Sequence, residues 1–160
     1  MHPSVQKSAE IIESLGMLGK VIEFDRTTKT ARDAAEALGC DVGAIANSLV
    51  FMADDGAILV LTSGAHRVDE KFLAEEIGFF SLRRATPAEV RLHTGQVVGG
   101  VSPFGRVKEI PVYIDVSLKD HPTIWSSAGT DNSVFSASYH ELVGALAAIE
   151  TRVAPLVEPE

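Results

Sequence analysis

The chain has 160 residues, of which 46% are hydrophobic and 22% charged, and its formal net charge is −8 at pH 7. This composition excludes a disordered chain, and the length fits one domain spanning residues 1–160. The acidic balance argues against non-specific binding to duplex nucleic acid, which needs a basic surface. No signal peptide or membrane-length apolar run is recognisable, so we expect a cytoplasmic protein that binds no membrane.

Periodicity and turn signals predict the elements in chain order. Helices are expected over 4–15, 30–38, 69–77, from 87 onward and over 139–149, and strands over 20–24, 48–53, 57–63, 111–116, 123–127 and 133–138. Thr86 and Ser138 each precede a glutamate by three residues, which predicts capping boxes. Asp54-Asp55-Gly56 predicts a tight hairpin, because Asp-Gly accepts the positive φ that such turns need.

The irregular alternation of short strands and helices favours an α/β (α+β) class. We expect a single compact domain with a mixed, curled or barrel-like sheet surrounded by helices, and not a doubly wound parallel sheet. No internal repeat or linker interrupts the chain.

The segment VVGGVSPFGR at 97–106 concentrates glycine and proline. Glycines let a backbone turn sharply and direct several N–H groups into one concavity. Such a nest suits a carbonyl oxygen that becomes negative during acyl transfer. An ordinary surface turn is the alternative interpretation.

Two further segments offer hydrogen-bonding groups. LTSGAHRVD (61–69) contributes Ser63, Gly64, His66 and Arg67, and SSAGTDNS (126–133) contributes Gly129 and Thr130. Each segment either lines a cleft or forms a polar connection, and Arg67 is equally suited to an internal ion pair with Asp69. Familiar catalytic and metal-binding patterns are missing from the sequence, and its five histidines lack metal-ligand spacing.

The ordered set of segments resembles the YbaK family, free-standing relatives of the editing domain inserted in bacterial prolyl-tRNA synthetases. The segments are IANSLVF (45–51), LVLTSGAHRVDEK (59–71), RRATPAEV (83–90), TGQVVGGVSPFG (94–105), VYIDVSL (112–118) and WSSAGTDNSVF (125–135). The resemblance implies a compact mixed α/β fold and hydrolysis of a wrong amino acid esterified to the 3′ end of tRNA. It implies no metal and no organic cofactor.

The resemblance also implies roles for individual residues. The loop of Gly99, Gly100, Val101, Ser102 and Pro103 would present backbone N–H groups to the substrate carbonyl, while the terminal ribose hydroxyl assists a water. Substrate contacts are expected from Asn47, Ser63, Gly64, His66, Arg67, Phe104, Gly129 and Thr130. The expected partner is the acceptor end of an aminoacyl-tRNA.

Asn47 departs from the family pattern, which has a lysine at this position. Asparagine brings no charge, and charge-assisted contacts to phosphate are the stronger kind. Either this branch binds the tRNA end differently, through Arg67 or Arg106, or it is a catalytically weak or inactive binding module. A third interpretation, sequence-specific DNA binding, is opposed by the net charge and by the lack of a helix-turn-helix pattern.

Overall fold

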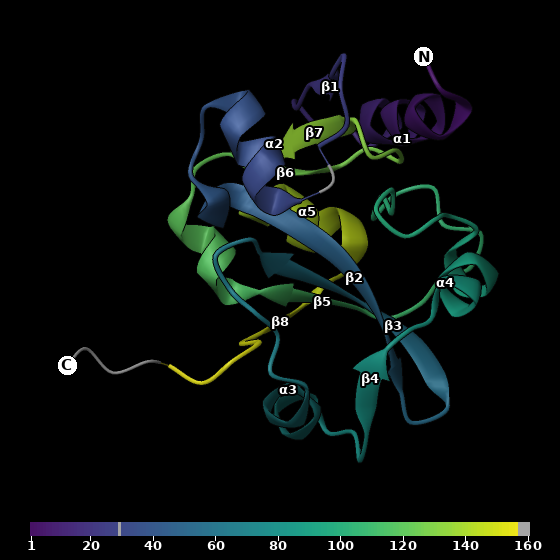
Figure 1. Ribbon diagram of the computed structural model, residues 1–160, viewed down its shortest axis with the longest axis vertical. Coiled ribbons are helices and arrows are strands. Elements are labelled where there is room, and N and C mark those ends of the chain that lie inside the picture. The colour runs from purple at the N-terminus through teal and green to yellow at the C-terminus, as the bar shows by residue number, and fades with distance from the viewer. Residues whose placement is uncertain (29, 157–160) are drawn as a thin grey trace.

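The computed structural model describes residues 1–28 and 30–156 as one α/β domain (Figure 1). Its strands are β1 (Val21–Glu23), β2 (Ile45–Ala53), β3 (Gly56–Ser63), β4 (Leu82–Arg84), β5 (Val112–Asp115), β6 (Ile124–Ser127), β7 (Ser133–Ala137) and β8 (Ile149–Thr151). Its helices are α1 (Pro3–Ser14), α2 (Ala31–Leu38), α3 (Glu70–Ile77), α4 (Pro87–Thr94) and α5 (Tyr139–Leu146), with 3-10 turns η1 (Val42–Ala44) and η2 (Val116–Asp120).

All eight strands form one mixed sheet in the order β1-β7-β6-β2-β3-β5-β8, with β4 pairing to β2. The pairs β2–β6, β3–β5 and β5–β8 are parallel and the others antiparallel. The ends β1 and β8 do not pair with each other, so the sheet is open. The predicted fold class, a mixed sheet surrounded by helices, is confirmed.

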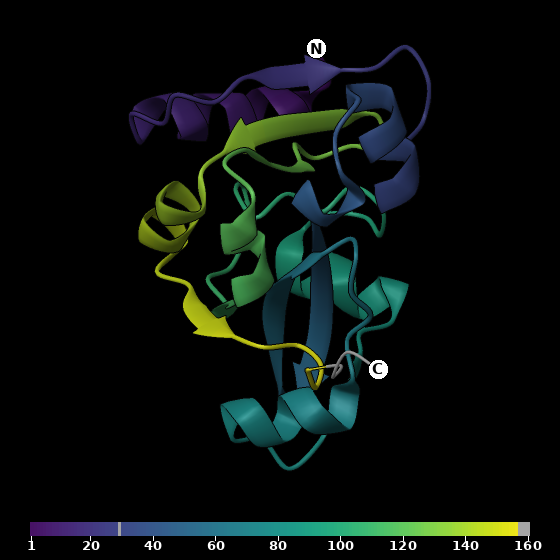
Figure 2. The same cartoon turned by 90° about the vertical axis from the view of Figure 1, so that its left-hand side faces the viewer.

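Helices cover the sheet unequally. Buried residues of α1, α4 and α5, among them Val5, Val90 and Leu142, share one core cluster with one face of the sheet. On the other face Leu73 of α3 packs in a cluster with Phe51. Figure 2 shows α1 beside β1 and β7 at one end of the molecule and α3 at the opposite end. No helix among the described residues is long and apolar enough to cross a membrane.

Helix boundaries follow the predicted caps in most places. The side chains of Thr86 and Ser138 complete both predicted capping boxes. The last helix, however, ends at Leu146 and not at Ile149, because Ala147 adopts a left-handed conformation with φ 49°. No glycine marks this end, so no stop signal for the helix can be read from the sequence there.

The β2–β3 hairpin is confirmed with a different turn residue. Ala53 pairs with Gly56, so Asp54 and Asp55 form the two-residue turn, and Asp54 takes the positive φ of 52°. Its carboxylate accepts the Ser81 N–H at 2.9 Å, which ties the turn to the segment before β4. The three-residue strands β4 and β8 were not predicted, and β2 begins at Ile45, three residues earlier than expected.

Candidate functional site

A cleft opens where one edge of β2 lacks a neighbouring strand. On that edge β6 pairs at Ile45 and Ala46 and β4 pairs from Phe51 to Ala53, so within the described chain no strand pairs with the stretch between them. The Val50 carbonyl accepts the Ala85 N–H at 3.0 Å on this edge. Because backbone directions alternate along a strand, the N–H and C=O groups of Ser48 point toward the same open edge.

This edge cleft has a volume of about 360 Å³. Residues 45–50 of β2, 125–127 of β6, α2, the turn after β6 and the loop after α4 line it, and the predicted site residues Asn47, Gly99, Val101 and Thr130 are among them. A second, side cleft of about 480 Å³ shares Val98, Thr130 and Asp131 with it and is also lined by the predicted Gly100 and Gly129. The glycine loop and the turn after β6 are therefore brought together.

The loop of residues 95–111 contains no helix or strand but is tied down by side-chain hydrogen bonds. The side-chain amide of Gln96 accepts the Ser102 N–H at 2.8 Å and donates to the Ser102 carbonyl at 2.9 Å. The buried Ser102 hydroxyl accepts from Ser8 Oγ at 2.9 Å and from the Phe104 N–H at 3.1 Å. Ser102 thus anchors the loop to α1, and Gln96 is a positioning residue that the sequence analysis missed.

Arg106 fastens the far side of the same loop. Its guanidinium donates to the carbonyls of Pro103 at 2.9 Å and Ile110 at 3.0 Å. Burial lowers the pKa of Arg106 from its ordinary value, and Glu109 acts in the opposite direction. Phe104 is buried with its ring centroid 5.5 Å from that of Phe135. Arg106 lines neither cleft, so its interactions are those of a loop clamp.

The two adjacent glycines have different functions in the loop. Gly99 needs to be glycine because its φ is 88°, and it lies exposed at the edge cleft. Gly100 donates its N–H to the Val97 carbonyl at 2.9 Å, and a Cβ there would lie 3.1 Å from Thr130 Cα. The N–H groups of Gly99 and Val101 have no partner in the described chain. Gly99 and Val101 thus line the edge cleft with N–H groups that make no hydrogen bond in the described chain, whereas the N–H group of Gly100 is already bonded.

The turn after β6 is closed by its own hydrogen bonds. Thr130 Oγ1 lies 2.7 Å from Asn132 Oδ1 and 2.6 Å from Ser133 Oγ, and the Gly129 N–H donates to Ser127 Oγ at 3.2 Å. Gly129 has a φ of 121°, and a Cβ there would lie 3.0 Å from the backbone of Ser4. The turn is thus a fixed wall between the two clefts.

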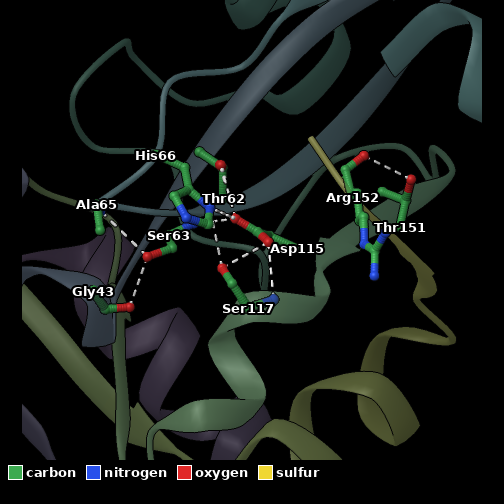
Figure 3. A network of polar contacts seen from close by, with 9 residues as sticks. All are labelled: Gly43, Thr62, Ser63, Ala65, His66, Asp115, Ser117, Thr151 and Arg152. Carbon is green, nitrogen blue, oxygen red and sulfur yellow. Dashed lines mark hydrogen bonds and ion pairs between the residues drawn. The ribbon is translucent and has the colours of Figure 1, made fainter. Parts of the chain in front are cut away.

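The remaining predicted residues, Ser63, Gly64, His66 and Arg67, line neither cleft. Figure 3 shows the side chains of Thr62, His66 and Ser117 converging on buried Asp115. Asp115 Oδ2 accepts the Ser63 N–H at 3.1 Å and lies 3.2 Å from His66 Nδ1, and Oδ1 accepts from Ser117 Oγ at 2.8 Å. Because Ser117 Oγ and Asp115 face the same nitrogen of His66, this is not a relay of nucleophile, base and acid.

The edge cleft contains residues that the sequence analysis missed, and three of them bear directly on its chemistry. Arg84 of β4 lines it, and so do Ser48 and Ser126, whose hydroxyl oxygens are buried and have no hydrogen-bond partner among the described residues. Buried polar atoms are almost always paired, so unpaired ones at a cleft indicate a place for a ligand group. The described residues contain no group of three or more His, Cys, Asp or Glu placed to hold a metal ion.

Comparison with known proteins identifies the class to which this fold and cleft belong. Residues 25–145 match the family model of the aminoacyl-tRNA editing domain, which covers well over half of the chain. The chain belongs to the aminoacyl-tRNA editing domain family, as the resemblance implied.

Two relatives align with about three quarters of this chain. YwhH of Bacillus subtilis (strain 168) is 37% identical over 123 residues, 76% of this chain and 78% of that protein. The proline–tRNA ligase of Shouchella clausii is 36% identical over 119 residues, which span 74% of this chain but only 20% of the ligase.

Solved structures share the whole fold. A candidate trans-editing enzyme for prolyl-tRNA synthetase matches with a TM-score of 0.87 and 37% identity, covering 97% of this chain and 99% of that one. The hypothetical protein APE2540 matches with a TM-score of 0.84 and 28% identity, covering 92% and 98%.

Proposed function

We propose that this chain is a trans-editing hydrolase that cleaves the ester between a small, wrongly attached amino acid and the 3′ end of a tRNA. The observation that carries the proposal is that Gly99 and Val101, whose N–H groups have no hydrogen-bond partner in the described chain, line the edge cleft in a member of the editing-domain family. Membership supports the substrate class, and the cleft supports the kind of chemistry.

The reaction needs few side chains. Water adds to the ester carbonyl, the Gly99 and Val101 N–H groups stabilise the oxygen as it becomes negative, and the carbon–oxygen bond to the ribose then breaks. The proton lost by the water ends on the ribose oxygen, with the neighbouring ribose hydroxyl assisting. Fixed donors of this kind act without reorganising, which agrees with the anchoring of the loop through Ser102 and Arg106.

The second candidate function is an inert module that binds a tRNA end. It is favoured by Asn47, which lines the edge cleft without bringing a charge. A panel of tRNAs mischarged with different amino acids separates the two functions when release of free amino acid is followed in single-turnover reactions. Hydrolysis above the spontaneous rate for at least one small amino acid supports the hydrolase, and binding without any acceleration supports the inert module.

The acidic chain should recognise only the acceptor end. Its net charge of −8 repels most tRNA phosphates, so affinity should be weak and discrimination should come from the amino-acid pocket, where one methylene is worth about 1–3 kcal/mol. An acceptor-stem minihelix carrying the same amino acid should react nearly as fast as full tRNA. If the minihelix reacts about 100-fold more slowly than full tRNA, the enzyme must also contact the tRNA far from its acceptor end.

A further inference from the structure

Arg84 is the one lysine or arginine that lines the edge cleft within the described chain. It ends β4, where it pairs with Phe51 of β2, and its guanidinium carbon lies 5.6 Å from the centroid of the Phe51 ring. Paired residues on neighbouring strands project from the same face of a sheet. The aromatic ring therefore fixes the cation at one end of the cleft.

The neighbouring Arg83 provides a direct contrast. Its two terminal nitrogens donate to the two carboxylate oxygens of Glu89 at 2.7 and 2.8 Å, so its charge is neutralised in a forked pair. Arg84 has no carboxylate within 4.0 Å and donates no side-chain hydrogen bond in the described part of the chain. Two adjacent arginines thus differ in that one has a protein partner and the other does not.

The position of Arg84 is suited to a ligand that lies along the open edge of β2. Side chains alternate between the two faces of a strand, so those of Asn47, Leu49 and Phe51 lie on the same face of β2. The four residue steps from Asn47 to Phe51 span about 13 Å. Asn47 stands at one end of this stretch, and Arg84 stands opposite Phe51 at the other. Asn47 is neutral, so Arg84 supplies the positive charge of the cleft.

We propose that Arg84 binds a backbone phosphate of the substrate's 3′-terminal nucleotides. This proposal rests on the proposed function, because it names the anion-binding residue of the same cleft. A guanidinium carries a permanent charge and a planar fork of donors that matches a phosphate, and an aromatic ring beneath it leaves that fork free. Phosphate is also the one formally charged group repeated along an RNA strand.

The test compares Arg84→Gln with Arg83→Gln, which remove the same charge from adjacent positions of one short strand. Equilibrium binding of an acceptor-stem minihelix that carries no amino acid is measured at several salt concentrations. Arg84→Gln should weaken binding about tenfold and flatten the slope of log affinity against log salt by about 0.7 to 0.9, the contribution of one phosphate contact. Arg83→Gln should leave both quantities near the wild-type values, and Arg84→Lys should keep most of the slope.

Urea unfolding of each variant separates binding from packing on Phe51. A loss of binding by Arg84→Gln with unchanged unfolding supports the phosphate contact. Equal salt slopes for wild type and Arg84→Gln, or no measurable minihelix binding by the wild type, would overturn it. Since the probe carries no amino acid, the outcome does not depend on hydrolysis. A wild type that binds through Arg84 but hydrolyses no mischarged tRNA would refute the proposed function alone.

Discussion

Two polar regions of this molecule look alike in composition and differ in how their groups are paired. Around Asp115, the carboxylate meets Ser63, His66 and Ser117, and Ser63 Oγ donates to the Gly43 carbonyl at 2.9 Å (Figure 3). In the edge cleft, by contrast, Ser48 Oγ, Ser126 Oγ and the guanidinium of Arg84 have no such partner in the described chain.

The difference distinguishes polar groups that stabilise the fold from those that are available to a ligand. A buried polar group left unpaired costs roughly 1–3 kcal/mol, so an unpaired one beside a cleft indicates a place where a ligand group satisfies it. The Asp115 network needs no ligand to be complete. The edge cleft leaves its polar groups open, so variants in the two regions should separate effects on activity from effects on stability.

Gly100→Ala should lower the single-turnover rate on mischarged tRNA by about 10²–10³, the effect expected when a neighbouring oxyanion donor, Gly99 or Val101, is moved out of place. The added methyl would lie 3.1 Å from Thr130 Cα and 3.2 Å from the Gly129 carbonyl oxygen, and should displace the loop that carries the Gly99 and Val101 donors. The free energy of unfolding should fall by only about 1 kcal/mol. Gly56→Ala is the control, because a Cβ there meets nothing within 4 Å. An unchanged rate would remove this loop from the chemistry.

Asp115→Ala should have the opposite signature. It leaves the buried N–H of Ser63 and the groups of Ser117 without their acceptor, so the free energy of unfolding should fall by about 3 kcal/mol. The rate per folded molecule should stay within about twofold of wild type, because Asp115 lines neither cleft. Urea unfolding and single-turnover rates on the same samples provide both readouts. If the variant is stable but inactive, the Asp115 network takes part in the reaction and this expectation is wrong.

The sequence predicted those parts of the site whose signal is local and missed those that depend on contacts between distant residues. The glycine loop was predicted because glycine and proline restrict the backbone in ways visible locally, as Gly99 with its φ of 88° illustrates. Arg84 was missed because it reaches the cleft through β4, a strand of three residues with no periodicity to detect. Ser63 and His66 were given the same weight as the loop because a sequence shows residue types and not their partners.

The fold was predictable wherever a local signal exists. Capping boxes at Thr86 and Ser138 gave the helix starts, whereas the left-handed Ala147 carried no signal and the helix before it was predicted too long. At the hairpin the sequence indicated a tight turn but not that Asp54 would take the positive φ. Its side-chain bond to the Ser81 N–H is a tertiary contact that local propensity does not contain.

Ser126→Ala and Ser63→Ala compare two buried serines of the two regions. Ser63 Oγ is paired with the Gly43 carbonyl, so its removal should cost about 1 kcal/mol of unfolding free energy. Ser126 Oγ has no partner in the part of the chain that the structure describes, so its removal should leave the unfolding free energy unchanged or raise it by up to about 1 kcal/mol. The rate of Ser126→Ala on mischarged tRNA should nevertheless fall, by roughly fivefold for about 1 kcal/mol of lost ligand contact. Equal destabilisation of both variants would mean that Ser126 has a protein partner after all.

The smallest effect concerns the exposed pair of Arg83 and Glu89, the paired counterpart of Arg84. Hydrogen bonds from the Arg83 side chain and the Thr86 N–H lower the pKa of Glu89 from its ordinary value of 4.5 to about 2. Because the folded-state pKa is the lower one, the stabilisation is complete above about pH 4.5 and is lost as the pH falls toward about 2.

Glu89→Gln keeps the capping geometry but removes the charge. Its urea midpoint should therefore lie slightly below that of the wild type near neutral pH, and the two should converge between pH 4.5 and 2. Because the pair is exposed, the gap should shrink in high salt. If the difference between the two urea midpoints persists at pH 2, it comes from the helix cap and not from the ion pair. Arg83 would then be as unpaired in solution as Arg84.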